Sequence, residues 1–226
     1  MSEEAIESRF DATREKGAVS SLLLRPAGAR WLLVLGHGAS TNLRHRTLQT
    51  IAERLAEVDI ATFRYNFPYM ERGGGGRDSQ AVSLATVRSA VAAAHAAADD
   101  LLLLAGGHSF GGRMTSLAAA ETPLDGVHAL VFFSFPLHPA GKPGIERAEH
   151  LDRVSVPMLF LSGTRDDLAD LDLLRPVCER LKDKATLHLL DTADHGFAVL
   201  KRSRLKDEDV FVEMARVLKE WLSDKG

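Results

Sequence analysis

The segment Leu101–Arg113 reads LLLLAGGHSFGGR and joins two kinds of local structure. Its first part is an unbroken apolar run after two aspartates, which is typical of a strand buried on both faces of a parallel sheet. The small, Ala-rich segment after Gly112 predicts a helix. Between them lies Gly107-x-Ser109-x-Gly111, the G-x-S-x-G pattern in the strand-to-helix context that it requires. We therefore predict that Ser109 lies on a tight, strained turn, where the two glycines prevent side-chain collisions.

Apolar runs alternate with amphipathic segments on both sides of this turn. Further strands are predicted at 19–24, 31–35, 60–65, 127–133, 156–161 and 186–190, and helices at 48–58, 79–98, 171–181 and 210–222. Regular alternation without internal repeats predicts a single domain over residues 1–226, of class α/β, with a doubly wound, mostly parallel sheet flanked by helices. The Pro- and Gly-rich connection after residue 133 carries one charged helical turn, from Glu146 to Arg153, so we expect little or no lid. Residues 1–17 are expected to pack at a sheet edge or to fray.

The composition excludes several classes of protein. Of the 226 residues, 45% are hydrophobic and 26% are charged, as in an ordinary globular domain, and the net charge of −3 offers no general attraction to nucleic acid or to an anionic membrane. The chain begins Met-Ser-Glu-Glu, without the basic and apolar segments of a signal peptide, and no run reaches transmembrane length. Its one cysteine, Cys178, has no internal partner for a disulfide. We therefore expect a cytoplasmic protein without nucleic-acid or membrane partners; the oligomeric state is left open.

Four loops follow the carboxyl ends of predicted strands, where open α/β sheets bind ligands. They span 36–40, 107–111, 163–167 and 194–197, and they supply in chain order a glycine turn, a serine, an acid and a histidine. Serine is a poor nucleophile near neutral pH and needs a base, for which His195 is predicted. Asp166 is predicted to hold the His195 ring and its charge, with Asp167 and Asp170 as alternatives. Asp191 and Asp194 are expected to cap the turn beside the histidine instead.

The same loops predict the remaining parts of a catalytic site. An oxyanion hole should be formed by the backbone N–H of Phe110 and a second N–H from Ala39 or Gly38. His37 is expected to hold its loop, and His108 to turn its side chain under the sheet. The other histidines lack metal-ligand spacing, so neither a metal nor a cofactor is predicted.

Aromatic and apolar residues near these loops are candidates for the wall of a substrate pocket that suits a short acyl chain. They are Tyr69, Met70, Phe110, Phe135, Leu137 and Phe197. The run Gly73–Gly76 lacks the Lys and Ser or Thr of a phosphate-binding loop and is interpreted as a mobile surface loop. Arg72, Arg77 and Arg113 are interpreted as solvated surface residues, although they could steer an anionic substrate.

With these residues in place, the chain resembles the α/β-hydrolase superfamily, in particular its small dienelactone-hydrolase-like members with little lid. The matching segments are 36–39, 64–69, 107–112, 163–166 and 194–197, which lie nearly from end to end of the chain. The resemblance implies the α/β-hydrolase fold and a serine hydrolase that cleaves small-molecule esters or thioesters. Dienelactone hydrolases proper use a cysteine nucleophile, whereas this chain has Ser109, which argues against that particular substrate.

Two alternatives to a serine hydrolase stay open at this point. Some similar proteins are non-catalytic, so the chain could be an α/β-hydrolase scaffold that acts as a binding or regulatory protein. Residues 36–41, GHGAST, also follow a strand and precede a helix, as a dinucleotide fingerprint does. Thr41 in place of the third glycine, and Arg64 where an acid would bind the ribose, argue against that second interpretation.

Overall fold

The computed structural model describes residues 4–200, 202–205 and 207–223, and within them the strands form one eight-stranded sheet. In chain order the strands are β1 (Ile6–Thr13), β2 (Gly17–Leu24), β3 (Trp31–Gly36), β4 (Ile60–Tyr65), β5 (Leu102–His108), β6 (Val127–Phe133), β7 (Met158–Gly163) and β8 (Ala185–Leu190). Their order across the sheet is β1-β2-β4-β3-β5-β6-β7-β8. Strands β3 to β8 pair in parallel, and only β1 and β2 run antiparallel to their neighbours. The predicted doubly wound, mostly parallel sheet is confirmed.

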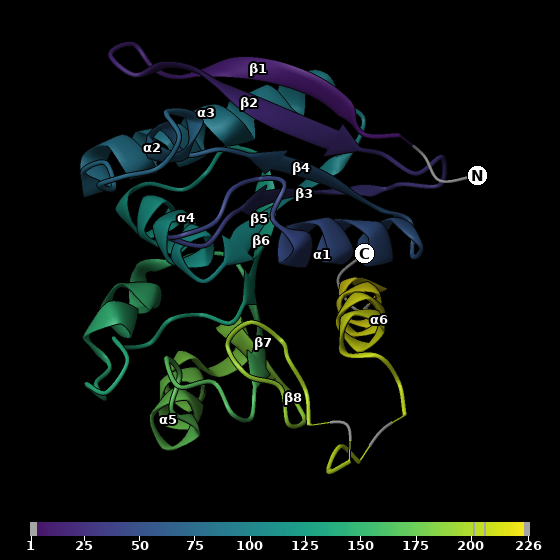
Figure 1. Cartoon of the computed structure of the whole chain (residues 1–226), viewed down its shortest axis with the longest axis vertical. Coiled ribbons are helices and arrows are strands. Elements are labelled where there is room, and N and C mark those ends of the chain that lie inside the picture. The colour runs from purple at the N-terminus through teal and green to yellow at the C-terminus, as the bar shows by residue number, and fades with distance from the viewer. Residues whose placement is uncertain (1–3, 201, 206, 224–226) are drawn as a thin grey trace.

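Helices cover both faces of this sheet (Figure 1). They are α1 (Arg46–Ala56), α2 (Pro68–Glu71), α3 (Gln80–Ala97), α4 (Phe110–Glu121), α5 (Leu171–Leu181) and α6 (Val210–Ser223), with 3-10 turns η1 (Glu146–Arg153) and η2 (Lys182–Lys184). The apolar residues of α3, α4 and α5 pack in one hydrophobic cluster, and those of α1 and α6 pack in another on the opposite face. The sheet is therefore buried between two helical layers.

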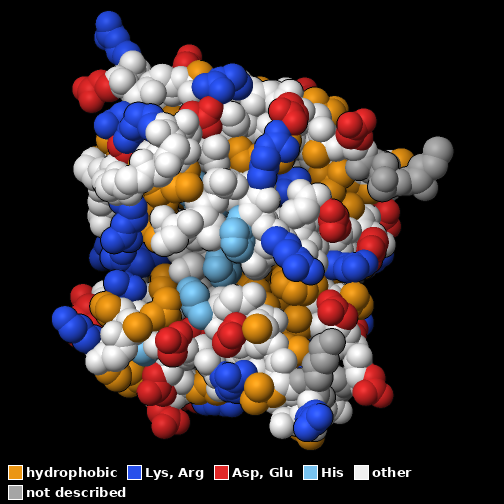
Figure 2. All heavy atoms as spheres, viewed as in Figure 1, with side chains coloured by type: hydrophobic (Ala, Val, Ile, Leu, Met, Phe, Trp, Pro, Cys, Tyr) orange, Lys and Arg blue, Asp and Glu red, His pale blue; other side chains and the backbone are white. Residues whose placement is uncertain are grey.

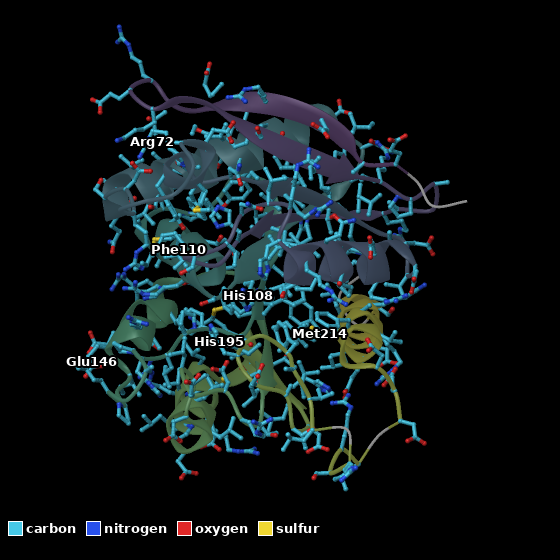
Figure 3. The ribbon with its side chains drawn as sticks, viewed as in Figure 1. Arg72, His108, Phe110, Glu146, His195 and Met214 are labelled. Atoms are coloured by element: carbon cyan, nitrogen blue, oxygen red, sulfur yellow. The ribbon has the colours of Figure 1, made fainter. Side chains whose placement is uncertain are left out.

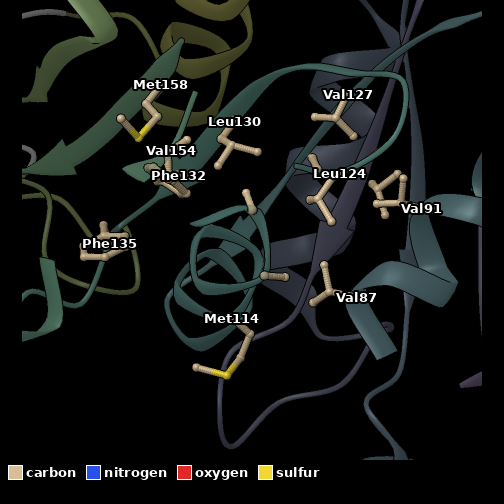
Figure 4. Packing of buried hydrophobic residues seen from close by; sticks show 14 of the residues in the cluster. Val87, Val91, Met114, Leu124, Val127, Leu130, Phe132, Phe135, Val154 and Met158 are labelled. Atoms are coloured by element: carbon tan, nitrogen blue, oxygen red, sulfur yellow. The ribbon is translucent and has the colours of Figure 1, made fainter. Parts of the chain in front are cut away.

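The central strands are apolar along their whole length because both of their faces are covered. In β3, Leu32 and Val34 belong to the cluster with α3 and α4, whereas Leu33 and Leu35 belong to the cluster with α1 and α6. Side chains alternate between faces along a strand, so an unbroken apolar run fills two cores at once. Figure 4 shows part of the first cluster, where Met114 of α4 and Phe132 of β6 are labelled.

The ends of the sheet and the connection between β6 and β7 agree with the sequence. Within residues 1–17, expected at an edge, β1 forms the edge strand of the sheet. The connection from residue 134 to 157 contains the 3-10 turn η1 and no α-helix, which agrees with the prediction of little or no lid. Among the described residues, we find no helix with the length and apolar character needed to cross a membrane.

Candidate active site

Ser109 lies in the sharp turn between β5 and α4. Its backbone has φ 51° and ψ −113°, a left-handed conformation that is strained for a residue with a side chain. The turn crosses the end of β3 so closely that a Cβ on Gly111 would lie 2.3 Å from the carbonyl carbon of Gly36. A Cβ on Gly107 would lie 2.5 Å from the Gly36 oxygen. The glycines at both positions are therefore required by the packing of the turn, as predicted.

Three side chains from distant loops form one line of hydrogen bonds. The Nε2 atom of His195 lies 2.8 Å from Oγ of Ser109, and its Nδ1 atom lies 2.8 and 2.9 Å from the two carboxylate oxygens of Asp166. The Asp166 side chain is fully buried, whereas the His195 side chain is 20% exposed. With Nδ1 protonated toward the carboxylate, Nε2 is left to accept the Ser109 hydroxyl proton.

The other aspartates near this line have different partners. Asp170 accepts the Asp172 N–H at the start of α5, and Asp194 accepts two N–H groups of its own turn. Asp167 is exposed, and no hydrogen bond joins it to His195 among the described residues. The Oδ1 atom of Asp166 also accepts the Leu168 N–H at 2.9 Å, which holds the carboxylate in place. Of the three candidate acids, the structure brings Asp166 to the histidine.

Backbone N–H groups of the predicted oxyanion hole are available at the same edge of the sheet. Among the described residues, the N–H groups of Gly38, Ala39 and Phe110 donate to no protein acceptor. Phe110 begins α4, where unpaired N–H groups and the positive end of the helix favour a negative charge. The Tyr69 hydroxyl donates to the carbonyl oxygen of Ala39 at 2.9 Å and so holds the loop after β3.

His37 lies in the loop after β3, is fully buried and forms hydrogen bonds through both of its ring nitrogens. Its Nε2 atom accepts the Phe67 N–H at 3.0 Å, and its Nδ1 atom donates to the Gly38 oxygen at 2.7 Å. Burial lowers the pKa of His37 to about 4, so its ring is neutral near pH 7. These bonds support the structural role predicted for His37.

The ring of His108 is buried against one face of the sheet, as expected. Its ring lies beside that of His195, with the ring centroids 5.4 Å apart, and its Nε2 atom is 3.0 Å from the backbone oxygen of His195 (Figure 3). Along β5 it shares a face with Leu104, and the chain around Phe197 packs against that face. The strict alternation of β5 could have revealed the face, but not the loop that covers it.

The predicted pocket wall is also corrected. Phe135 and Leu137 are at most 1% exposed and lie in the core, where Phe135 contacts Phe132 and Phe160. Phe197 is 2% exposed and packs against His108 on the opposite face of the sheet. Phe135 and Phe197 follow strand ends and turn into the core, because burial there removes their apolar surface from water.

Two of the pocket candidates lie nearer the loop after β3. Tyr69 is 1% exposed, and its hydroxyl binds the loop after β3. Met70 is half-buried, and its place in a pocket stays a prediction. Within the described residues, no group of three or more His, Cys, Asp and Glu side chains is arranged to hold a metal ion.

Comparison with known proteins agrees with this architecture. A family model described as an alpha/beta hydrolase domain matches residues 29–223. The chain is similar to the crystal structure of dienelactone hydrolase from Anabaena variabilis, with 19% identity over 98% of each chain and a TM-score of 0.73. It is also similar to XC6422 from Xanthomonas campestris, described as an α/β serine hydrolase without lid, with 20% identity over 98% of this chain and 94% of that one and a TM-score of 0.74. A third similar structure is Est1E from Butyrivibrio proteoclasticus, with 17% identity over 98% of each chain and a TM-score of 0.72. At these identities the likeness shows the fold.

Proposed function

Since this chain belongs to the alpha/beta hydrolase family, we propose that it is a serine hydrolase that cleaves small-molecule carboxylic esters or thioesters through an acyl-enzyme on Ser109. The observation that carries the proposal is the unbroken line of hydrogen bonds from Asp166 through His195 to Ser109. A nucleophile, a base and a group that orients the base, each within hydrogen-bond reach of the next, are the parts that acyl transfer needs.

The first half of the reaction forms the acyl-enzyme. Nε2 of His195 takes the hydroxyl proton while Oγ of Ser109 attacks the carbonyl carbon of the substrate, and the carbonyl oxygen becomes an oxyanion. Asp166 stabilises the imidazolium that forms, because its buried carboxylate faces Nδ1. When the tetrahedral intermediate collapses, the bond to the alcohol or thiol breaks and His195 returns the proton to the leaving group. Water then attacks the carbonyl carbon of the acyl-enzyme while Nε2 of His195 takes its proton. The bond to Oγ of Ser109 breaks, His195 returns the proton to Oγ, and the acid is released.

The oxyanion is the charge that the N–H groups at the strand ends would bind. Phe110 supplies one donor, and Ala39 or Gly38 supplies the second. The hydrogen bonds of Tyr69 and His37 to this loop keep the donors in position before substrate arrives. Removal of one such donor in other enzymes costs about 100- to 1,000-fold in kcat.

Hydrolysis of 4-nitrophenyl acetate and butyrate by the wild type and by Ser109→Ala tests the proposal. We expect the substitution to lower kcat by several powers of ten, with an unchanged melting temperature. Ser116→Ala is a matched control, because Ser116 also lies 2.7 Å from a histidine nitrogen, that of His150, but is fully buried. Equal rates for the wild type and Ser109→Ala would refute the proposal.

Labelling by a fluorophosphonate probe checks activation of the serine independently of the substrate. Such probes react quickly only with a serine whose proton is accepted by a neighbouring base. We expect labelling in the wild type and in Ser116→Ala, and none in Ser109→Ala or in His195→Ala. A folded wild type that stays unlabelled would instead favour a non-catalytic scaffold.

A further inference from the structure

A surface hollow of about 370 Å³ adjoins Phe110, the residue that follows Ser109. We call it the arginine hollow; it is lined by Arg77, Asp78, Gln80, Ser83, Phe110, Arg113 and Met114. Arg77 follows the four glycines 73–76, and Arg113 lies on α4. The hollow therefore lies between the start of α3 and the first turns of the helix that carries the proposed oxyanion donor.

Both arginines of the lining lie close to Ser109 or to its neighbour Phe110. The N–H of Arg113 donates to the Ser109 oxygen at 3.1 Å, so Arg113 lies one helical turn from Ser109, about 6 Å along the helix axis. The guanidinium carbon of Arg77 lies 5.6 Å from the centre of the Phe110 ring, in a cation–π contact. Two positive charges thus flank Phe110.

A third arginine, Arg147, lies in η1, which packs against α4 outside the lining of the hollow. Burial lowers the pKa of Arg113, and the positive charges of Arg147 and Arg77 lower it further. The pKa of Arg147 is likewise lowered by burial and by Arg77. The Nε atom of Arg113 is buried and bonds to no described residue.

Among the described residues, the arginines of the hollow are not paired with a carboxylate, although Asp78, whose Oδ2 atom is buried without a partner, lines the hollow with them. Arg77, Arg113 and Arg147 form no ion pair with any described acidic residue. Asp78 lines the hollow, but its Oδ1 atom is already bound by Lys16 and Arg72, each at 3.0 Å. Figure 2 shows Lys and Arg side chains on both sides of the row of histidines on this face. The chain as a whole carries a net charge of −3, so this local positive charge does not follow from a general excess.

We propose that the arginine hollow binds a negatively charged oxygen group of the substrate, a carboxylate or a phosphate, a few bonds from the scissile carbonyl. The inference rests on the proposed function and narrows its substrate class to anionic esters or thioesters. Guanidinium groups match the oxygens of carboxylate and phosphate with paired N–H donors, and partial burial strengthens such bonds. A bound anion would also relieve the repulsion between Arg77 and Arg113.

Two matched substrate pairs test the inference and distinguish the two positions of the charge. Mono-4-nitrophenyl adipate against 4-nitrophenyl hexanoate places a carboxylate on the acyl side. Acetyl-coenzyme A against S-acetyl-N-acetylcysteamine places phosphates on the leaving group. We expect the wild type to prefer the charged member of at least one pair by tenfold or more in kcat/KM, and the preference to weaken at high salt.

Variants of the arginines decide whether the hollow causes the preference. Arg113→Gln should lower the preference by about ten- to a hundredfold, the usual effect of losing a hydrogen bond to a charged group, while the neutral ester changes less than about twofold. Arg113→Lys should restore part of it, since the charge returns without the paired donors. Arg175→Gln is the matched control, because Arg175 is exposed on α5 and does not line the hollow. This variant should keep the preference for the charged substrate. Arg77→Gln, at an exposed position, serves if Arg113→Gln does not fold.

The outcomes separate the inference from the proposed function. Equal kcat/KM within both pairs, with neutral esters still hydrolysed in a Ser109-dependent way, would overturn the inference alone. A preference that survives both Arg113→Gln and Arg77→Gln would also overturn it. Neutral esters hydrolysed no faster by the wild type than by Ser109→Ala would refute the proposed function, and the inference with it.

Discussion

Replacement of Asp166 by asparagine removes one charge from the site and keeps its shape. The Oδ1 atom lies 2.8 Å from Nδ1 of His195 and 2.9 Å from the Leu168 nitrogen, and an amide oxygen at that place can accept both N–H groups. The orientation of the His195 ring should therefore survive. The main loss is the attraction between a carboxylate and the imidazolium that exists only after His195 has taken the serine proton. The amide NH2 in place of Oδ2 also removes the second acceptor of the Nδ1 proton.

The size of that loss follows from the geometry. The carboxylate is fully buried and the ring is largely buried, so water screens the pair only in part. Two unit charges about 4 Å apart interact by about 4 kcal/mol at an effective dielectric constant of about 20. A transition state raised by that amount slows the reaction by about a thousandfold. Because the neutral ring of the resting site gains little from the charge, kcat should fall and KM should change little.

Steady-state hydrolysis of 4-nitrophenyl butyrate by the wild type, Asp166→Asn and Asp167→Asn measures the effect. Asp167 is the matched control, because it is exposed and has no hydrogen bond to His195 among the described residues. Thermal unfolding confirms that each variant is folded. A fall of less than about tenfold for Asp166→Asn, or an equal fall for Asp167→Asn, would refute the reasoning.

Three further predictions concern the packing around the site. Gly111→Ala places a Cβ 2.3 Å from backbone, so the free energy of unfolding should fall by about 1–3 kcal/mol or more. Gly76→Ala meets nothing within 4 Å and should change it by less than about 0.5 kcal/mol; equal melting temperatures would contradict this contrast. Tyr69→Phe frees the loop after β3 and should lower kcat while costing about 1 kcal/mol of stability; an unchanged kcat would show that the hydroxyl is not needed there. Burial lowers the pKa of His37 and of His108 to about 4, so the unfolded chain binds more protons than the folded one between about pH 6.5 and pH 4. Stability should be complete above that window and fall by up to about 3 kcal/mol per histidine on acidification, and urea unfolding at pH 7.5 and 4.5 that gives equal free energies would argue against it.

Features that depend on neighbours in the chain were determined by the sequence alone. Unbroken apolar runs such as 101–105 are visible in the sequence itself, and they are typical of strands that are buried on both faces. The two helical layers agree with this pattern, from which the fold class was predicted. The spacing of Gly107, Ser109 and Gly111 predicted a strained turn, although the closest neighbour of both glycines is Gly36 at the end of β3, which the spacing does not reveal. Since strands in parallel place their carboxyl ends at one edge, the loops of Asp166 and His195 could also be assigned to the same edge as Ser109.

The tertiary structure decided what depends on the direction of a side chain after a strand ends. The sequence predicted Asp166 and left Asp167 and Asp170 as alternatives, and the turn after β7 brings the first of them to His195. The rings of Phe135 and Phe197 turn into the core because the packing of other segments leaves room there. The arginines at 77 and 113 carry no shared pattern, and two separate segments bring them beside Phe110. The physical reason is the same in each case: loop backbone angles and packing between distant segments set these positions, and periodicity along the chain contains no information about either.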